Sequence, residues 1–346
     1  MQTATIDHKR NIALDIIRIF AMLDIFTFHF MGALGRTNSV FYGYKNGGWG
    51  SVGSTIFFVL SGFLLYDRYQ EMQLCRREVL GFYKKRFLSI IPLQIVCFSV
   101  FFFANYILTR NLWYGGKGWK IIFSFFGIDG YMGMYGIQTY HIVGEWFTTI
   151  ILLVYLLFPI LLAMFKKLRW GATIIIAALY FLNIVFSFQT ISPDASVFTG
   201  IFVFWTGMLI CEYQKRIKEY KWPVVLAGIL ILVIVLVRLP QVKGSPLPWK
   251  NLLGISMFVL LYFLLSLVTV SSKVRICLYK ASDMAFAFYL CHHYMIYRYI
   301  EYFPTFVQGN KRVFASWGVI LVSSAVVSWI LNMGVKRILF RFKDGV

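Results

Sequence analysis

Charged side chains are scarce in this chain of 346 residues, and acidic ones are the scarcest. Charged residues make up 14% of the sequence, against about 25% in a typical soluble domain. Hydrophobic residues make up 59%, and the mean hydropathy is +0.71. This composition excludes an ordinary soluble domain and indicates an integral membrane protein. The net charge of +20 does not indicate a nucleic-acid partner, because the basic residues flank apolar runs and form no separate stripe.

Cysteine is rare as well. The five cysteines contain no CxxC pair and no spacing typical of a metal site, so we expect neither a bound metal nor a disulfide. The first apolar run contains charged residues, is longer than a signal-peptide core, and is followed by no small-residue cleavage pattern. We therefore expect it to remain in the protein as the first membrane helix.

Apolar runs long enough to cross a bilayer, about 20 residues each, recur along the whole chain. We predict an all-α polytopic membrane protein of about ten transmembrane helices. It is expected to form a single transmembrane domain over residues 1–346, with no appended soluble domain. The predicted helices are 12–34, 50–66, 88–108, 142–165, 171–188, 196–213, 222–239, 251–270, 282–300 and 314–335.

The positions of the basic residues test this topology independently. With a cytoplasmic N-terminus, 22 of the 34 Lys and Arg fall in cytoplasmic segments and ten in outer segments, while Arg18 and Arg298 lie within helices. Short cytoplasmic loops carry such an excess of Lys and Arg. We therefore predict that both termini are cytoplasmic. The longest outer loop is then 109–141, which is rich in Tyr and Trp.

The first predicted helix carries four ionisable side chains, Asp15, Arg18, Asp24 and His29. Such groups cost roughly 2.5–3.5 kcal/mol at the centre of a membrane helix and therefore mark candidate functional positions. At about 100° per residue, His29 lies about three turns and 20° beyond Arg18. Asp15 precedes Arg18 by one turn and can pair with it. These three side chains form one polar stripe, whereas Asp24 points elsewhere.

The stripe suits acyl transfer. A buried imidazole can accept a proton from a hydroxyl, and a buried guanidinium can hold a phosphate or a developing oxyanion. The residues alone leave a second interpretation open, in which the same side chains form a polar network that only joins helices.

Five segments, taken in order, resemble the acyltransferase 3 family of membrane O-acyltransferases. The first is the stripe itself, with ten residues between Arg18 and His29 and with Asp15 three residues before Arg18. The segment FFVLSGF at 57–63 is similar to the family's FFxxSGF motif. The remaining segments are the basic stretch 82–92, the Trp–Tyr–Pro segment 146–159, and the late segment 282–292, which ends in YLCH. The ordered set covers most of the chain.

The resemblance implies roles for the polar stripe. His29 is the implied catalytic residue, as general base or as transient acyl acceptor. Arg18 is implied to orient the acyl donor, and Asp15 to support Arg18 without taking part in the chemistry. The alternatives are a structural hydrogen bond for His29 and a helix-packing ion pair for Arg18 and Asp15.

Two further segments carry implied supporting and donor-binding residues. Ser61 and Gly62 fall in the FFxxSGF motif, where small residues also allow two helices to approach closely. Lys85 and Arg86 match the family's basic segment and are expected to bind the phosphates of acyl-CoA. Their alternative is the positive charge of a cytoplasmic loop. Ser89 stands where the family often has a second Arg.

Other candidates lie near the predicted outer face. Glu145 and Trp146 are expected on the acceptor side, although Trp146 also fits an interfacial aromatic belt. Some family members have a carboxylate just after this Trp, where this chain has Thr148 and Thr149 and offers only Glu145 before the Trp. His292 and His293 are expected to be structural more often than catalytic.

These observations predict a membrane O-acyltransferase that moves an acyl group, expected to be acetyl, from cytoplasmic acyl-CoA to a hydroxyl of a cell-surface glycan or glycan-lipid. Acyl-CoA is then a substrate, and no bound cofactor is expected. A bacterial plasma membrane is implied by the resemblance alone. One alternative is a polysaccharide or small-molecule transporter or flippase, which explains the intramembrane charges but not the ordered motifs. A glycan polymerase is the other, and it would need larger outer loops.

Overall fold

The computed structural model describes residues 11–44, 47–144, 146–187, 191–304 and 309–344. Within these ranges the chain is almost entirely helical. The long helices are α1 (Ile12–Ala33), α2 (Trp49–Tyr69), α3 (Arg76–Thr109), α6 (Trp146–Phe186), α7 (Val197–Glu219), α8 (Lys221–Arg238), α9 (Leu247–Ser266), α11 (Ala285–Tyr302) and α12 (Asn310–Asp344). The shorter elements are the antiparallel strands β1 (Gly43–Tyr44) and β2 (Gly47–Gly48), the helices α4 (Ile121–Phe125), α5 (Asp129–Met134) and α10 (Ser272–Asp283), and the 3₁₀ turns η1 (Gly118–Lys120), η2 (Pro193–Ala195) and η3 (Leu239–Gln241).

Each of the ten apolar ranges predicted from the sequence is mostly helical, so the all-α polytopic fold is confirmed. Among the described residues, seven helices are long and apolar enough to cross a membrane, namely α2, α3, α6, α7, α8, α9 and α12. Helix α6 contains two of the predicted helices, joined at a kink where Leu168 has φ −136° and ψ 36°. The number of ten membrane crossings and the cytoplasmic position of both termini stay predictions.

The helix boundaries differ from the prediction where charged residues continue an apolar run. Helix α3 begins at Arg76 rather than near 88, so the basic stretch is helical and continuous with the membrane segment. Its 34 residues correspond to about 51 Å at about 1.5 Å per residue, well beyond a hydrocarbon core of about 30 Å. The amphipathic helix α10 was not predicted, because its Lys and Arg residues indicated a loop.

Polar caps define the start of three helices. The side chain of Asn11 accepts a hydrogen bond from the backbone of Ala13 at the start of α1. Ser196 and Ser271 do the same at the starts of α7 and α10. A capping side chain satisfies a backbone N–H that has no partner within the helix. These caps fix where the apolar runs enter the bundle.

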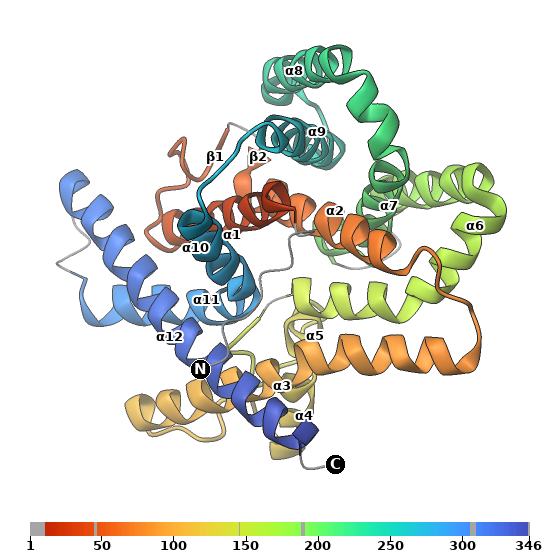
Figure 1. Ribbon diagram of the computed structural model, residues 1–346. Coiled ribbons are helices and arrows are strands. Elements are labelled where there is room, and N and C mark those ends of the chain that lie inside the picture. The colour runs from red at the N-terminus through yellow and green to blue at the C-terminus, as the bar shows by residue number, and fades with distance from the viewer. Residues whose placement is uncertain (1–10, 45–46, 145, 188–190, 305–308, 345–346) are drawn as a thin grey trace.

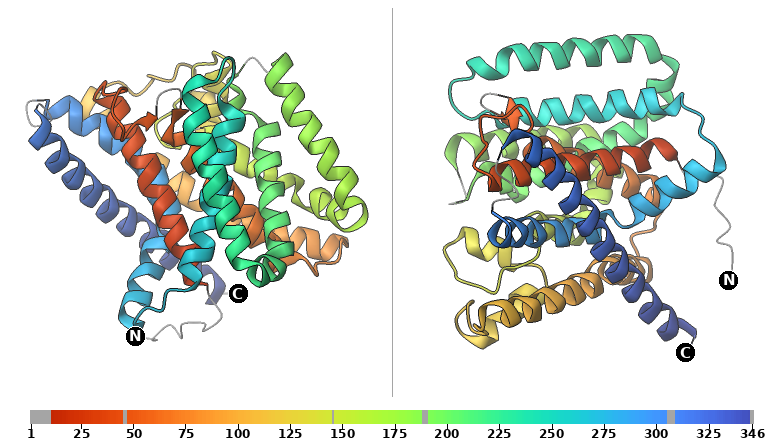
Figure 2. Two further views of the ribbon diagram at one scale, coloured as in Figure 1. Left: turned by 90° about the horizontal axis from the view of Figure 1, so that it is seen from above. Right: turned by 90° about the vertical axis from the view of Figure 1, so that its left-hand side faces the viewer.

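Helices α1 and α2 lie at the centre of the bundle (Figure 1). Helix α2 packs against α1, α7 and α9, and α1 also contacts α10, α11 and α12. The α6–α9 segment covers one side of this pair, and α3, α11 and α12 cover the other, with α12 crossing the remaining helices obliquely (Figure 2). The polar residues of α1 are therefore enclosed by other helices.

Close approach of α2 and α7 depends on two glycines. A Cβ atom at Gly62 would lie 1.9 Å from the backbone oxygen of Phe204, and one at Gly207 would lie 2.1 Å from the backbone oxygen of Val59. Small residues let membrane helices meet backbone to backbone in this way. Gly62 therefore has a packing role, which is the alternative that the FFxxSGF motif left open.

The segment between α3 and α6 folds back onto both helices. Gln94 of α3 donates a hydrogen bond to the carbonyl oxygen of Ser124 at 2.9 Å, and Thr149 of α6 donates to that of Gly127 at 2.8 Å. Tyr140 is fully buried, and its hydroxyl donates to the carbonyl of Gly116 at 2.6 Å. Part of the aromatic content of this segment therefore serves its own folding.

Replacement of Gly62 by alanine is expected to destabilise the protein by about 1–3 kcal/mol, because the added methyl meets a backbone oxygen that cannot move aside alone. Thermal unfolding of the purified protein in detergent measures the effect. The matched control is Gly81→Ala in α3, where an added Cβ meets nothing within 4 Å. Equal unfolding midpoints for the two variants would contradict the packing argument.

Candidate active site

Arg18 is fixed in the second turn of α1 by two contacts. Its NH1 atom donates to the hydroxyl of Ser282 at 2.8 Å and lies 3.9 Å from Oδ1 of Asp15. Asp15 is buried, with 4% of its surface exposed. The predicted pairing of Asp15 with Arg18 is confirmed, and Ser282 joins it from the end of α10.

Arg18 lines a cavity of about 230 Å³, called here the Arg18 cavity. Its polar wall also includes Ser61 of α2, Arg86 of α3 and Tyr155 of α6. The remaining lining is mostly Leu, Ile and Phe side chains. The cavity thus combines two guanidinium groups with an apolar wall.

His29 lies eleven residues further along α1 and lines a second cavity, of about 160 Å³, called here the His29 cavity. Ser51 and Ser54 of α2, Trp146 of α6 and Asp194 of η2 also line it. This cavity is more polar in its residues than the Arg18 cavity. It lies toward the end of α1, whereas the Arg18 cavity lies toward its beginning.

The two cavities adjoin each other. Phe147 and Tyr289 line both, and their ring centroids are 5.3 Å apart. Arg18 and His29 therefore face the interior of the bundle on opposite sides of one aromatic wall. Asp24, by contrast, lies against Gly53 of α2, where an added Cβ would be 2.7 Å from its Oδ2 atom. The direction inferred for these side chains from the helical spacing is correct.

A second histidine is in contact with His29. Nε2 of His293 lies 3.2 Å from Nδ1 of His29, and the two rings are nearly perpendicular, with centroids 4.5 Å apart. The pairs Arg18–Ser282 and His29–His293 both join residues 264 positions apart. The chain from Ser282 into α11 therefore runs parallel to α1 and in a fixed register, contributing one contact at each cavity.

His292 has a different environment from its neighbour. Its Nδ1 atom lies 2.7 Å from the carbonyl oxygen of Tyr289, which can only accept a hydrogen bond, so this nitrogen carries the proton. The ring is 2% exposed and stacks on Phe288 with an interplanar angle of 4°. These contacts fit the structural role expected for His292, whereas the same expectation missed the contact made by His293.

The two donor-binding candidates are separated by the helical phase of α3. Arg86 lines the Arg18 cavity, and its guanidinium carbon lies 5.7 Å from the ring centroid of Tyr69. Lys85 is exposed and does not line either cavity. On the other side, Trp146 lines the His29 cavity, and Glu145 lies outside the described residues.

Sequence reasoning did not propose Asp194, Phe147 or Tyr289 for the site. Asp194 follows Ser–Pro in a polar turn between two apolar helices, which is a signal for a turn but not for a site. The two aromatic residues fell inside quoted motifs without a role of their own. In the described part of the chain, no three His, Cys, Asp or Glu side chains are placed to share a metal ion.

The fold and the two cavities define a polytopic membrane protein with a polar site enclosed between its helices. A family model described as an acyltransferase domain, that of the acyltransferase 3 family, matches residues 11–333. The chain belongs to this family of membrane acyltransferases, which supports acyl transfer over transport or glycan polymerisation. Comparisons with curated proteins and with solved structures gave no match.

Proposed function

We propose that this protein transfers an acyl group, acetyl in the first instance, from acyl-CoA to a hydroxyl of a cell-surface glycan or glycan-lipid. The observation that carries the proposal is the pair of adjoining cavities, with Arg18 in one and His29 in the other. In this proposal acyl-CoA enters from the cytoplasm into the Arg18 cavity, and the acceptor enters the His29 cavity from the outer side of a bacterial plasma membrane.

The chemistry of the Arg18 cavity supports its assignment to the donor. Arg18 and Arg86 supply guanidinium groups that bind phosphate or carbonyl oxygens with charge-assisted hydrogen bonds. The apolar lining suits the aliphatic arm and the acyl group of the donor. Gly62 lies on α2, which forms part of this lining. It allows α7 to pack closely against α2.

His29 is the proposed general base. Its Nε2 atom accepts the proton of the acceptor hydroxyl while the hydroxyl oxygen attacks the thioester carbonyl carbon. The carbon–sulfur bond then breaks, and the leaving thiolate takes the proton from His29. An ester and a free CoA thiol result, and His29 returns to its starting protonation state.

His293 is the proposed positioning residue for this base. When Nδ1 of His29 donates its hydrogen to Nε2 of His293, the lone pair of His29 is left on its own Nε2 atom. The same hydrogen bond stabilises the imidazolium that forms when His29 takes the proton. A carboxylate performs this task in hydrolase triads, and a neutral imidazole can perform it with less electrostatic stabilisation.

Substitution of His29 by alanine is expected to lower acetyl transfer roughly 100- to 10,000-fold, since the proton acceptor is lost. The measurement is free CoA released from acetyl-CoA by purified protein with membrane glycan from the producing cells, together with the mass of the glycan. His141→Ala is the control, because His141 lines neither cavity. Undiminished acetylation by a folded His29→Ala protein would refute the base assignment, and wild-type protein that releases no CoA would favour a carrier.

Removal of the His293 ring by His293→Ala is expected to lower kcat roughly 10- to 100-fold while the KM for acetyl-CoA stays unchanged, because only the orientation of His29 is affected. Glutamine offers an acceptor oxygen to Nδ1 of His29, so His293→Gln should recover part of the rate. A purely structural role predicts equal losses in both variants, in proportion to the fall in thermal stability.

The helical phase of α3 predicts unequal effects at its two basic candidates. Arg86→Ala should raise the KM for acetyl-CoA roughly tenfold or more, as expected for loss of a charge-assisted hydrogen bond. Lys85→Ala should change it less than about twofold, because an exposed cation contributes little. Steady-state kinetics with acetyl-CoA as the varied substrate make the comparison. A larger effect at Lys85 would move the donor site away from the Arg18 cavity.

A further inference from the structure

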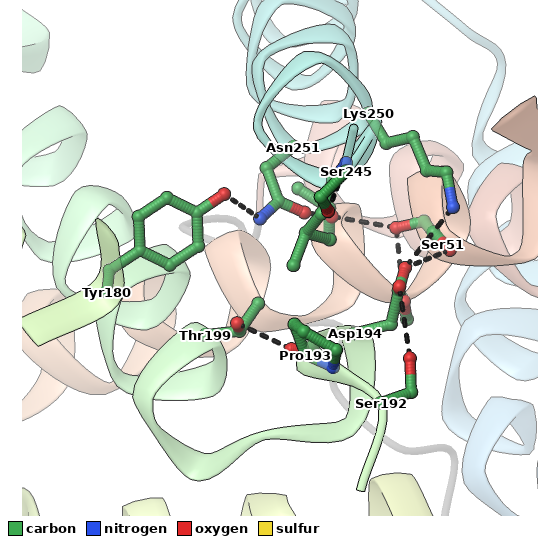
Figure 3. Close-up of polar contacts among 12 residues, drawn as sticks. Ser51, Tyr180, Ser192, Pro193, Asp194, Thr199, Ser245, Lys250 and Asn251 are labelled. Atoms are coloured by element: carbon green, nitrogen blue, oxygen red, sulfur yellow. Dashed lines mark hydrogen bonds and ion pairs between the residues drawn. The ribbon is translucent and has the colours of Figure 1, made fainter. Parts of the chain in front are cut away.

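Three elements meet at one carboxylate on the wall of the His29 cavity. Asp194 belongs to η2, and its Oδ1 atom accepts a hydrogen bond from the hydroxyl of Ser51, in the first turn of α2, at 2.7 Å. The Nζ atom of Lys250, in the first turn of α9, lies 3.4 Å from the same oxygen. Figure 3 shows the contacts from both side chains meeting at the carboxylate of Asp194.

The carboxylate keeps capacity to accept further hydrogen bonds. Its second oxygen, Oδ2, is 3.4 Å from the hydroxyl of Ser192, and the Lys250 contact is equally long. An ionised carboxylate offers about four acceptor positions. With 29% of its side chain exposed, Asp194 can present an oxygen to a molecule in the cavity.

Holding the helices together does not by itself explain why a carboxylate stands at position 194. A neighbouring series of hydrogen bonds already joins α2, α9 and α6. Thr55 donates to Oδ1 of Asn251 at 2.9 Å, and Nδ2 of Asn251 donates to the hydroxyl of Tyr180 at 2.9 Å. These three residues are buried and do not line the His29 cavity. Figure 3 shows Asn251 and Tyr180 beside the Asp194 contacts. The two sets differ because Asp194 and Ser51 line the His29 cavity.

Most of the other residues that line the cavity are hydroxyl-bearing or aromatic. Ser51 and Ser54 lie on one helix, and Phe28 and Trp146 come from α1 and α6. Aromatic rings present apolar faces that can cover the C–H face of a sugar ring. A carboxylate accepts hydrogen bonds from sugar hydroxyls. The polar part of the lining therefore matches a hydroxyl-rich ring.

We propose that Asp194 is the acceptor-binding residue, and that it receives hydrogen bonds from hydroxyls of an uncharged sugar ring whose acylated hydroxyl lies at Nε2 of His29. The proposal rests on the proposed function and names the class of its acceptor. An anionic sugar is disfavoured, because its charge would approach the carboxylate in a partly buried cavity. Lys250 of α9 holds the carboxylate in place and partly neutralises its charge on the side that faces α9.

The test compares neutral and charged sugars with the full-length protein in detergent. Methyl glucoside, methyl galactoside and methyl mannoside serve as neutral acceptors, and methyl glucuronoside as the anionic one, each with acetyl-CoA as donor. The wild type should acetylate at least one neutral glycoside with a higher kcat/KM than the glucuronoside. Asp194→Asn should raise the KM for that glycoside roughly 10- to 100-fold, while the KM for acetyl-CoA stays unchanged. Asp194→Ala, which removes both acceptor oxygens, should raise this KM at least as much as Asp194→Asn.

Two controls separate binding from folding. Thr55→Val breaks the neighbouring series of hydrogen bonds and should lower the unfolding temperature without changing the glycoside KM. Ser192→Ala removes a contact to Asp194 from outside the cavity and should leave both KM values near those of the wild type. An unchanged glycoside KM in both Asp194 variants would overturn the proposal, as would preference for the glucuronoside or no transfer to any neutral glycoside. If any of these results is found while the wild type still releases CoA in a His29-dependent manner, the acceptor proposal fails and the proposed function stands. If no CoA is released, both the acceptor proposal and the proposed function fail.

Discussion

Enclosure of the polar stripe of α1 is the constraint on which the rest of the structure depends. Asp15, Arg18 and His29 would each be costly in contact with lipid, and five helices pack around α1 instead. Asp15 is 4% exposed, and Arg18 contacts Ser282 across the helix interface. Because α1 is surrounded by other helices, its polar side chains contact residues of several of them. The two cavities form along that central helix.

Register between α1 and the α10–α11 segment is the second consequence. One segment supplies Ser282 to Arg18 and, eleven residues later, His293 to His29. Because helices that run parallel advance by the same rise per residue, a single alignment satisfies both contacts. A shift of one residue would break both together. Close packing of this kind holds a side chain in one orientation better than a flexible loop would.

The sequence predicted the features that depend on spacing within a single helix. It predicted fewer of the features that depend on contacts between two helices. Helical spacing placed Asp15, Arg18 and His29 on one side of α1 and Asp24 on another, and the structure agrees. Each apolar range predicted from the sequence is mostly helical. The partner of His29 comes from 264 residues away, and nothing in the local pattern of α11 distinguishes His293 from His292.

The donor candidates and Asp194 show two other limits of sequence reasoning. Lys85 and Arg86 differ only in helical phase, which is undefined as long as the basic stretch is taken for a loop. Asp194 occupies a short 3₁₀ turn whose position over the His29 cavity follows from how α6 and α7 are packed. Turn chemistry in the sequence indicates that the chain reverses there, but the surface that it covers depends on the tertiary fold.

The aromatic wall of Phe147 and Tyr289 relates the two cavities to the proposed reaction. If the cavities formed one open channel, water from the acceptor side would reach the thioester and hydrolyse it. Phe147 and Tyr289 line both cavities, and in the proposed reaction a small acyl group on a flexible arm passes these two rings. Excluding water also strengthens every electrostatic contact at the reacting atoms. The two rings are thus compatible with a proposal in which the acyl group is short and in which donor and acceptor enter from opposite ends of the bundle.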